Sequence, residues 1–159
     1  MGFETTAARL WKRLAPEDRL AAATCFARDP APEMLSSAVL AIAQARRMRP
    51  QAARALPPAT QARILATVLE LGEALASSLL VALHLGERRS LLAAFLDATG
   101  LLHENGILKE ESGPKRLADA VARDALKAVA GRFPDRQVQV YLNTLWLQDP
   151  ERWDALRAL

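Results

Sequence analysis

The amino-acid sequence predicts an all-α fold, and we expect a single-domain, irregular bundle of about 7–9 helices around one long central helix. Hydrophobic residues make up 51% of the 159 residues, yet Phe, Trp and Tyr together contribute only 5%. The core must therefore be built mainly from Leu, Ala and Val, of which Leu and Ala are strong helix formers. Prolines recur at the starts of apolar-periodic segments, where a missing backbone N–H is not needed.

The predicted central helix covers residues 58–85. Its apolar side chains recur at helical spacing and form a face so broad that other helices must cover it. Its narrow polar side consists of Glu70, Glu73, Ser77 and His84. The preceding Leu56-Pro57-Pro58 divides the expected domain into sub-layers 1–55 and 58–159.

Before the central helix, apolar spacing and prolines predict helices at 3–14, 16–28 and 32–48, followed by a short helical turn at 51–55. Glu17 and Asp18 favour the start of the second helix, because negative charge is stabilised at a helix N-terminus.

After the central helix, a helix from residue 87 is expected to end at Gly100 with a left-handed cap. Asn105-Gly106 is a turn signal, and we expect a tight loop there rather than an isolated hairpin, which is marginally stable. Further helices are predicted at 114–132, from residue 134, and from Pro150 to the last residues.

Basic and acidic residues are unevenly distributed, although the formal net charge is only +3. Residues 1–69 carry 10 basic and 5 acidic side chains, whereas residues 70–159 carry 11 and 13. No Asp or Glu occurs within 34–69. The basic residues of that acid-free segment are Arg46, Arg47, Arg49, Arg54 and Arg63.

Arg46, Arg47, Arg49 and Arg54 are the predicted partner-binding residues. A cluster of one charge sign favours a partner of the other, and we expect an acidic protein. Nucleic acid is disfavoured, because no aromatic side chains are interleaved with the arginines and no nucleic-acid-binding signature surrounds them. The alternative without function is a helix end whose arginines complement the helix dipole, beside a solvated loop.

Catalytic motifs are absent from the sequence, which weighs against an enzyme. There is no Gly-x-Ser-x-Gly elbow, phosphate loop, dinucleotide fingerprint or zinc pattern, and no cofactor is expected. A catalytic site assembled from residues distant in sequence would leave no such motif. Cys25 lies among apolar neighbours, as inert buried thiols do.

The polar residues with some potential for ligand contact surround the two histidines: His84, Asp97, His103 and Glu104. His84 is expected on the polar side of the central helix near its C-terminus. His103 and Glu104 are expected to be polar loop residues. Antiparallel helices would place the two histidines roughly 18 Å apart, so no metal site is predicted.

These observations favour a non-catalytic helical interaction domain with a basic edge for an acidic protein. The alternative is a bundle that holds a small apolar or amphipathic ligand beside the central helix, where Gly72 and Ser77-Ser78 are small. Homodimerisation is a further way to cover the broad apolar face.

The location expected is the cytoplasm. No basic-then-apolar leader is found, the uncharged run at 74–86 is shorter than the ~20 residues of a membrane span, and the single Cys25 cannot form an internal disulfide. The excess of Arg (17) over Lys (4), with abundant Ala, predicts a bacterial source.

Overall fold

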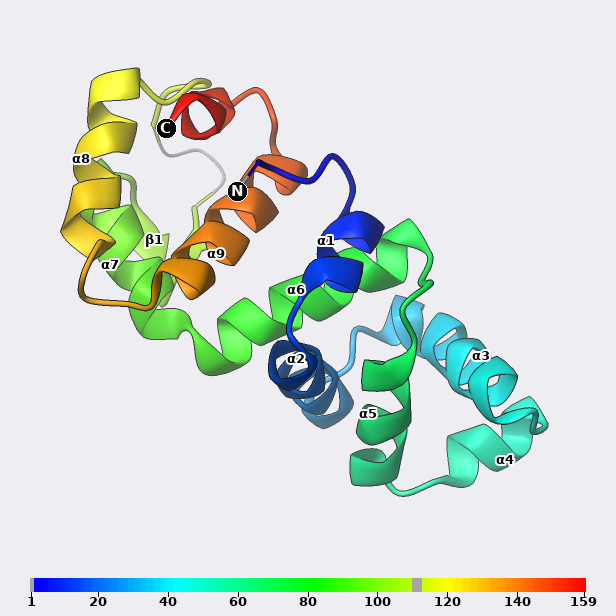
Figure 1. The fold of residues 1–159 in the computed structure, drawn as a ribbon. Coiled ribbons are helices and arrows are strands. Elements are labelled where there is room, and N and C mark those ends of the chain that lie inside the picture. The colour runs from blue at the N-terminus through cyan, green and yellow to red at the C-terminus, as the bar shows by residue number, and fades with distance from the viewer. Residues whose placement is uncertain (1, 110–112) are drawn as a thin grey trace. The chain divides into compact units, whose positions relative to one another are not determined.

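The computed structural model describes residues 2–109 and 113–159. Within these residues 69% of the structure is helical, with nine α-helices, which confirms the all-α prediction (Figure 1). None of the helices in this part of the chain is both long and apolar enough to cross a membrane. The elements are α1 (Ala7–Arg13), α2 (Pro16–Arg28), η1 (Pro32–Met34), α3 (Leu35–Arg46), α4 (Pro50–Ala55), α5 (Pro58–Thr67), α6 (Glu73–Glu87), α7 (Arg89–Thr99), β1 (His103–Glu104), β2 (Ile107–Leu108), α8 (Asp119–Val129), α9 (Asp135–Gln148) and η2 (Asp154–Ala158).

The chain divides into two compact units. The first is Thr6–Glu87, with α1 to α6, and the second comprises residues 2–5 and Arg88–Leu159. The first unit contains ten basic and seven acidic residues, while the second contains eleven of each, so the net charge of +3 belongs to the first. The single-domain organisation and its sub-layers remain predictions.

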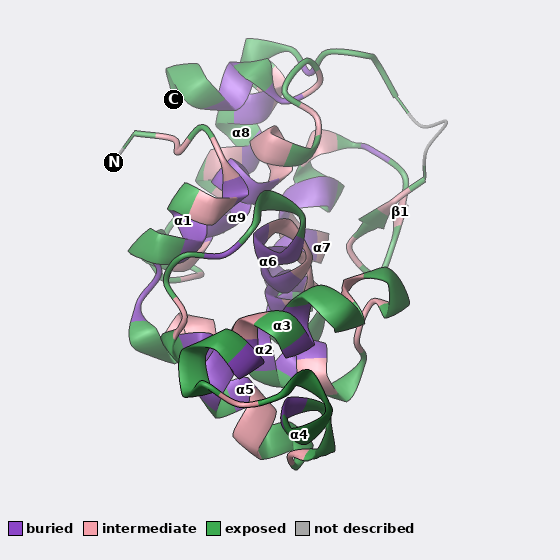
Figure 2. Cartoon of the chain, turned by 90° about the vertical axis from the view of Figure 1, so that its right-hand side faces the viewer, coloured by how far each residue is buried: buried purple, intermediate pink, exposed green. Residues whose placement is uncertain are grey.

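Helix α2 lies at the centre of the first unit. It packs against both α5 and α6, while α1 packs against α6 and α3 packs against α4 and α5. Ala22, Ala23 and Cys25 on α2 are buried together with Phe26, and such small side chains allow close approach of neighbouring helices. Figure 2 shows α2, α3 and α5 in purple where they face one another and in green on their outer sides.

The prediction of one long helix at 58–85 is wrong. Helix α5 ends at Thr67, Val68 is extended (φ −79°, ψ 110°), and α6 begins at Glu73. A continuous helix would be about 42 Å long, whereas a compact unit of roughly 80 residues is about 30 Å across. The break lets both halves pack on α2.

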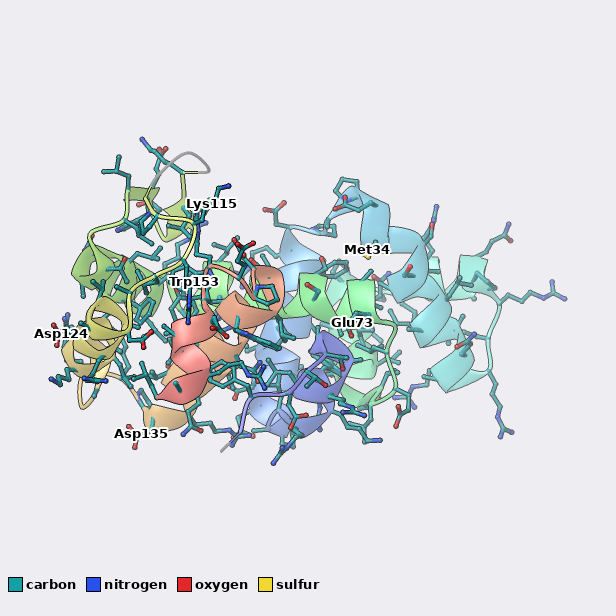
Figure 3. The ribbon with its side chains drawn as sticks, turned by 90° about the horizontal axis from the view of Figure 1, so that it is seen from above. Met34, Glu73, Lys115, Asp124, Asp135 and Trp153 are labelled. Carbon is teal, nitrogen blue, oxygen red and sulfur yellow. The ribbon has the colours of Figure 1, made fainter. Side chains whose placement is uncertain are left out.

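Two side chains satisfy backbone groups near this break. The indole Nε1 of Trp11 donates to the Val68 carbonyl at 2.8 Å, replacing the helical bond lost there. Glu73, labelled in Figure 3, accepts hydrogen bonds from the backbone N–H groups of Ala7 (2.6 Å) and Ala8 (3.0 Å). The break and the start of α1 therefore support each other.

The second unit is built around an aromatic cluster. Phe95 on α7 meets the ring of Tyr141 on α9 edge-on at 5.6 Å between centroids, and lies 6.1 Å from Trp153. Trp153 is fully buried and is labelled in Figure 3. Helix α8 packs on α7, and η2 contacts α8 and α9. The predicted left-handed cap at Gly100 is confirmed, with φ 73° and ψ 8°.

A short hairpin replaces the tight loop expected around Asn105-Gly106. His103 pairs with Leu108 and Glu104 with Ile107, antiparallel. Asn105 (φ 51°) and Gly106 (φ 85°) both have positive φ, the signature of a type I′ turn. The expectation failed because the pair is not isolated: β1 contacts α7.

Several predicted helix ends were also wrong. The first helix starts at Ala7 because the backbone before it is bonded to the side chain of Asn143. Oδ1 of Asn143 accepts the Glu4 N–H at 2.8 Å, and Nδ2 donates to the Glu4 carbonyl at 3.0 Å. The helix expected at 114–132 begins at Asp119, because the Leu117 N–H donates to the Arg152 carbonyl at 2.9 Å. The helix expected at 32–48 is η1 followed by α3, and the terminal helix is the short η2.

Candidate functional site

The four predicted partner-binding arginines lie together around α4. Arg46 is the last residue of α3, Arg47 and Arg49 lie in the connection, and Arg54 is in the last turn of α4. All four are exposed, as is Arg63 on α5. In Figure 3, long nitrogen-ended side chains extend from the cyan ribbon of α3 and α4. We call these five arginines and the apolar side chains between them, Met48, Leu56 and Ile64, the basic surface.

Arg47 has the left-handed backbone conformation, with φ 52° and ψ 44°. Its N–H donates to the Gln44 carbonyl at 3.3 Å and the Met48 N–H donates to the Ala43 carbonyl at 3.0 Å, which together form a Schellman cap. Glycine is the usual residue at this position, and another residue there costs roughly 1–2 kcal/mol. Such strain often marks functional positions.

Arg49 also occupies a position that its local structure disfavours. It is the N-cap of α4, where Ser, Thr, Asp or Asn would supply a side-chain oxygen, and no side chain caps this end. A positive charge there also opposes the helix dipole. Two of the arginines are therefore not explained by helix capping.

Gln61 fixes α4 on α5. Its Nε2 lies 3.2 Å from the Ala53 carbonyl oxygen and 3.0 Å from each of the Arg54 and Leu56 carbonyl oxygens. These carbonyls lie at the end of α4, where helical N–H donors run out, although that of Ala53 also accepts the Leu56 N–H at 3.3 Å. All three neighbours are acceptors, which defines the orientation of the amide. Gln61 was not predicted as a site residue, because no local sequence pattern links it to α4.

An open depression lies within the basic surface. Met48, Leu56 and Ile64 give it an apolar lining, and Arg46, Thr60 and Arg63 complete it. No aromatic or acidic side chain contributes to this lining. Arg63 belongs to the acid-free segment seen in the sequence, but its place beside the other arginines depends on how α5 packs.

The arginines of the basic surface are not neutralised within their unit. Among the residues that the structure describes, none of the five has a carboxylate within ion-pairing distance. Arg63 donates from Nη2 to Thr60 Oγ1 at 3.3 Å. The positive charge is therefore directed to solvent, where a partner can meet it.

The structure places the four residues predicted as ligand contacts in different surroundings. His84 is buried, with 3% of its surface exposed, so its expected place on a solvated polar side is wrong. Asp97 and His103 are brought together: Nε2 of His103 lies 2.7 Å from Oδ1 of Asp97. Glu104 is exposed on β1.

His103 has both ring nitrogens engaged. Nδ1 accepts the Gly106 N–H at 3.2 Å, so the neutral ring carries its proton on Nε2 and donates it to Asp97. No lone pair remains for a metal or a substrate proton. The imidazole instead ties the hairpin turn to α7.

Cys25 is buried and its thiol lies 3.7 Å from Oε1 of Glu87. Burial raises the pKa of the Cys25 thiol, and the negative charge of Glu87 raises it further, whereas Arg28 acts in the opposite direction. The protonated thiol is a poor nucleophile.

In the described residues, the side chains that could ligate a metal are scattered, and one apolar cavity is small. No group of three or more His, Cys, Asp or Glu side chains there could hold a metal ion. An apolar cavity between α2, α3 and α5 has a volume of about 50 Å³, smaller than the roughly 150 Å³ that admits benzene. The ligand-binding alternative remains a prediction.

Comparison of the chain with models of known protein families, with curated proteins and with solved structures finds no match. The basic surface must therefore be interpreted from its own chemistry.

Proposed function

We propose that this chain is a non-catalytic helical interaction module whose basic surface binds an acidic segment of another protein. The observation that carries the proposal is the group of five exposed arginines with no ion-pairing carboxylate among the described residues. Arg47 and Arg49 add support, because each stands where local backbone physics favours a different residue. A cytoplasmic location and a bacterial source remain predictions from the sequence.

A protein partner is favoured over nucleic acid by the composition of the basic surface. Proteins that bind single-stranded nucleic acid usually offer aromatic side chains on which bases stack. The basic surface has none, and its apolar residues are aliphatic or thioether side chains. Such side chains suit the apolar side of a protein segment.

Site-specific photo-crosslinking tests the proposal. Ala52 is exposed on α4, beside the arginines, and can carry a photo-crosslinking residue, while exposed Ala120 on α8 serves as the control position. The full chain is expressed in the organism that encodes it, and crosslinked proteins are identified by mass spectrometry. We expect an acidic protein at Ala52 and not at Ala120.

Charge reversal provides the matched control. Arg46→Glu with Arg47→Glu should abolish the Ala52 product, whereas Arg123→Glu with Arg132→Glu changes the net charge equally and should preserve it. The purified partner must then bind the wild-type chain more tightly than the first variant. A nuclease-sensitive product, a second copy of this chain, or a product indifferent to Arg46 and Arg47 would contradict the proposal.

A further inference from the structure

A second open depression adjoins the first on the same unit. Leu20, Ala66 and Leu69 give it an apolar lining, with Pro16, Arg19 and Arg63 around them. Leu20 and Leu69 are each 41% exposed, so both present apolar surface to solvent beside Arg63. Arg63 contributes to both depressions, so it lies between them.

The charged groups near the second depression differ in how they are engaged. Arg19 bonds the Ala66 carbonyl through Nε at 3.0 Å and the Leu14 carbonyl through Nη1, so its guanidinium is used by the fold. Glu70, which follows Leu69, is paired with Lys12. Arg63 meets no carboxylate in the described part of the chain.

We infer that the partner segment is amphipathic, with an acidic side chain on Arg63 and one apolar side chain in each depression. The inference rests on the proposed function and specifies which acidic segments qualify. Charge complementarity selects an Asp or Glu of the partner to face Arg63. The carboxylate of either residue can accept two parallel hydrogen bonds from a guanidinium. The apolar linings on both sides select Leu, Ile, Met or Phe at the flanking positions.

The dimensions of α5 match a short helical partner. Thr60 is the first α5 residue that lines the first depression and Thr67 is the last that lines the second, so together the depressions span roughly 10 Å of α5, at 1.5 Å per residue. A partner helix advances the same distance in about two turns. Two of its residues that are seven positions apart then lie on one face, and a third residue between them can lie on that same face.

Two synthetic peptides of equal charge test the inference. The first is an acidic, helix-forming peptide with two leucines two turns apart and a glutamate between them on the same face. In the second, both leucines are replaced by glutamine. Binding to the full chain is measured by fluorescence anisotropy at about 50 mM NaCl, where surface charge is only partly screened.

We expect the leucine peptide to bind about tenfold more tightly or better, since each leucine removes apolar surface from water. Arg63→Gln should remove most of that affinity, whereas Arg123→Gln on α8 should not. Circular dichroism of both variants checks that the fold is intact.

The other outcomes separate the two proposals. If both peptides bound equally and lost their binding to the Arg46→Glu, Arg47→Glu variant, this inference would be overturned. The proposal of an acidic protein partner would stand. Binding of neither peptide, or tighter binding of an oligonucleotide of matched charge, would overturn both.

Discussion

At the scale of single residues, Arg47 offers the clearest separation of stability from function. Its left-handed conformation is the one that glycine adopts without penalty. Arg47→Gly should therefore increase the free energy of unfolding, although glycine also makes the unfolded chain more flexible. The net increase should be roughly 0.5–1 kcal/mol. The same change removes a charge from the basic surface and should weaken peptide binding. Urea denaturation and anisotropy measure the two effects.

Arg123→Gly is the control for that substitution. Arg123 is exposed within α8, where glycine disfavours the helix by about 1 kcal/mol. It should therefore lower stability and leave peptide binding unchanged. If Arg47→Gly also lowered stability, the strain assigned to Arg47 would be wrong.

Cys25 gives the protein a defined pH dependence. Because burial and Glu87 raise the pKa of the thiol in the folded state, its contribution to stability is complete below the pKa of an unfolded thiol, about 8.5, and is lost as the pH rises through the folded value. When the pH is raised from 7 to above about 9, the wild-type chain should therefore lose stability relative to Cys25→Ala. Urea denaturation at both pH values measures it, and a pH-independent difference would refute the assignment.

At the scale of elements, the contact between α2 and α6 depends on Gly86. A Cβ at Gly86 would overlap Cys25 Sγ and lie 3.0 Å from Cys25 Cβ. Although alanine favours helix, Gly86→Ala should destabilise the fold by about 1–3 kcal/mol through overpacking. In a Cys25→Ala background the penalty should fall, and a double-mutant cycle measures the coupling. If the two substitutions had additive effects on the free energy of unfolding, the contact between Gly86 and Cys25 would not limit the packing of α2 and α6.

The position of α4 depends on Gln61. Gln61→Glu keeps the size of the side chain but turns a carboxylate toward three carbonyl oxygens, so the end of α4 should detach from α5. We expect faster hydrogen exchange in α4 and weaker peptide binding. Gln44→Glu, exposed on α3, introduces the same charge and should leave exchange in α4 unchanged. Unaltered hydrogen exchange of α4 in the Gln61→Glu variant would contradict the role of Gln61 in holding α4 on α5.

The helix starts at Pro16 and Pro58 could be predicted from sequence, whereas Pro114 and Pro150, which were also expected to open helices, do not begin one. The interruption of the central helix could not be predicted either. Pro16, Pro50 and Pro58 each begin a helix, because their fixed φ and missing N–H suit the first turn. The break at Val68 had only weak local signals, Thr67-Val68 and Gly72. It is stabilised by Trp11, far away in sequence, and by the packing of both halves on α2.

At the scale of the whole molecule, the sequence predicted which arginines belong to the candidate site but not what lies between them. Arg46, Arg47, Arg49 and Arg54 are close in sequence, so their clustering needed no tertiary information. Arg63, Leu20 and Leu69 meet only through the packing of α2 and α5. His84 shows the same limit, because its burial depends on which helices cover α6.

The net charge of +3 belongs to Thr6–Glu87, and the basic surface lies wholly within that unit. Binding should therefore weaken as salt screens the arginines, with a remainder at high salt from the apolar depressions.

The most direct measurement is an NMR titration of the full, isotope-labelled chain with the acidic leucine peptide. Backbone amide shifts should concentrate at residues 46–69 and around Leu20, and should disappear in the Arg46→Glu, Arg47→Glu variant. Shifts concentrated within Arg88–Leu159, or none at a saturating peptide concentration, would contradict a binding role for the basic surface.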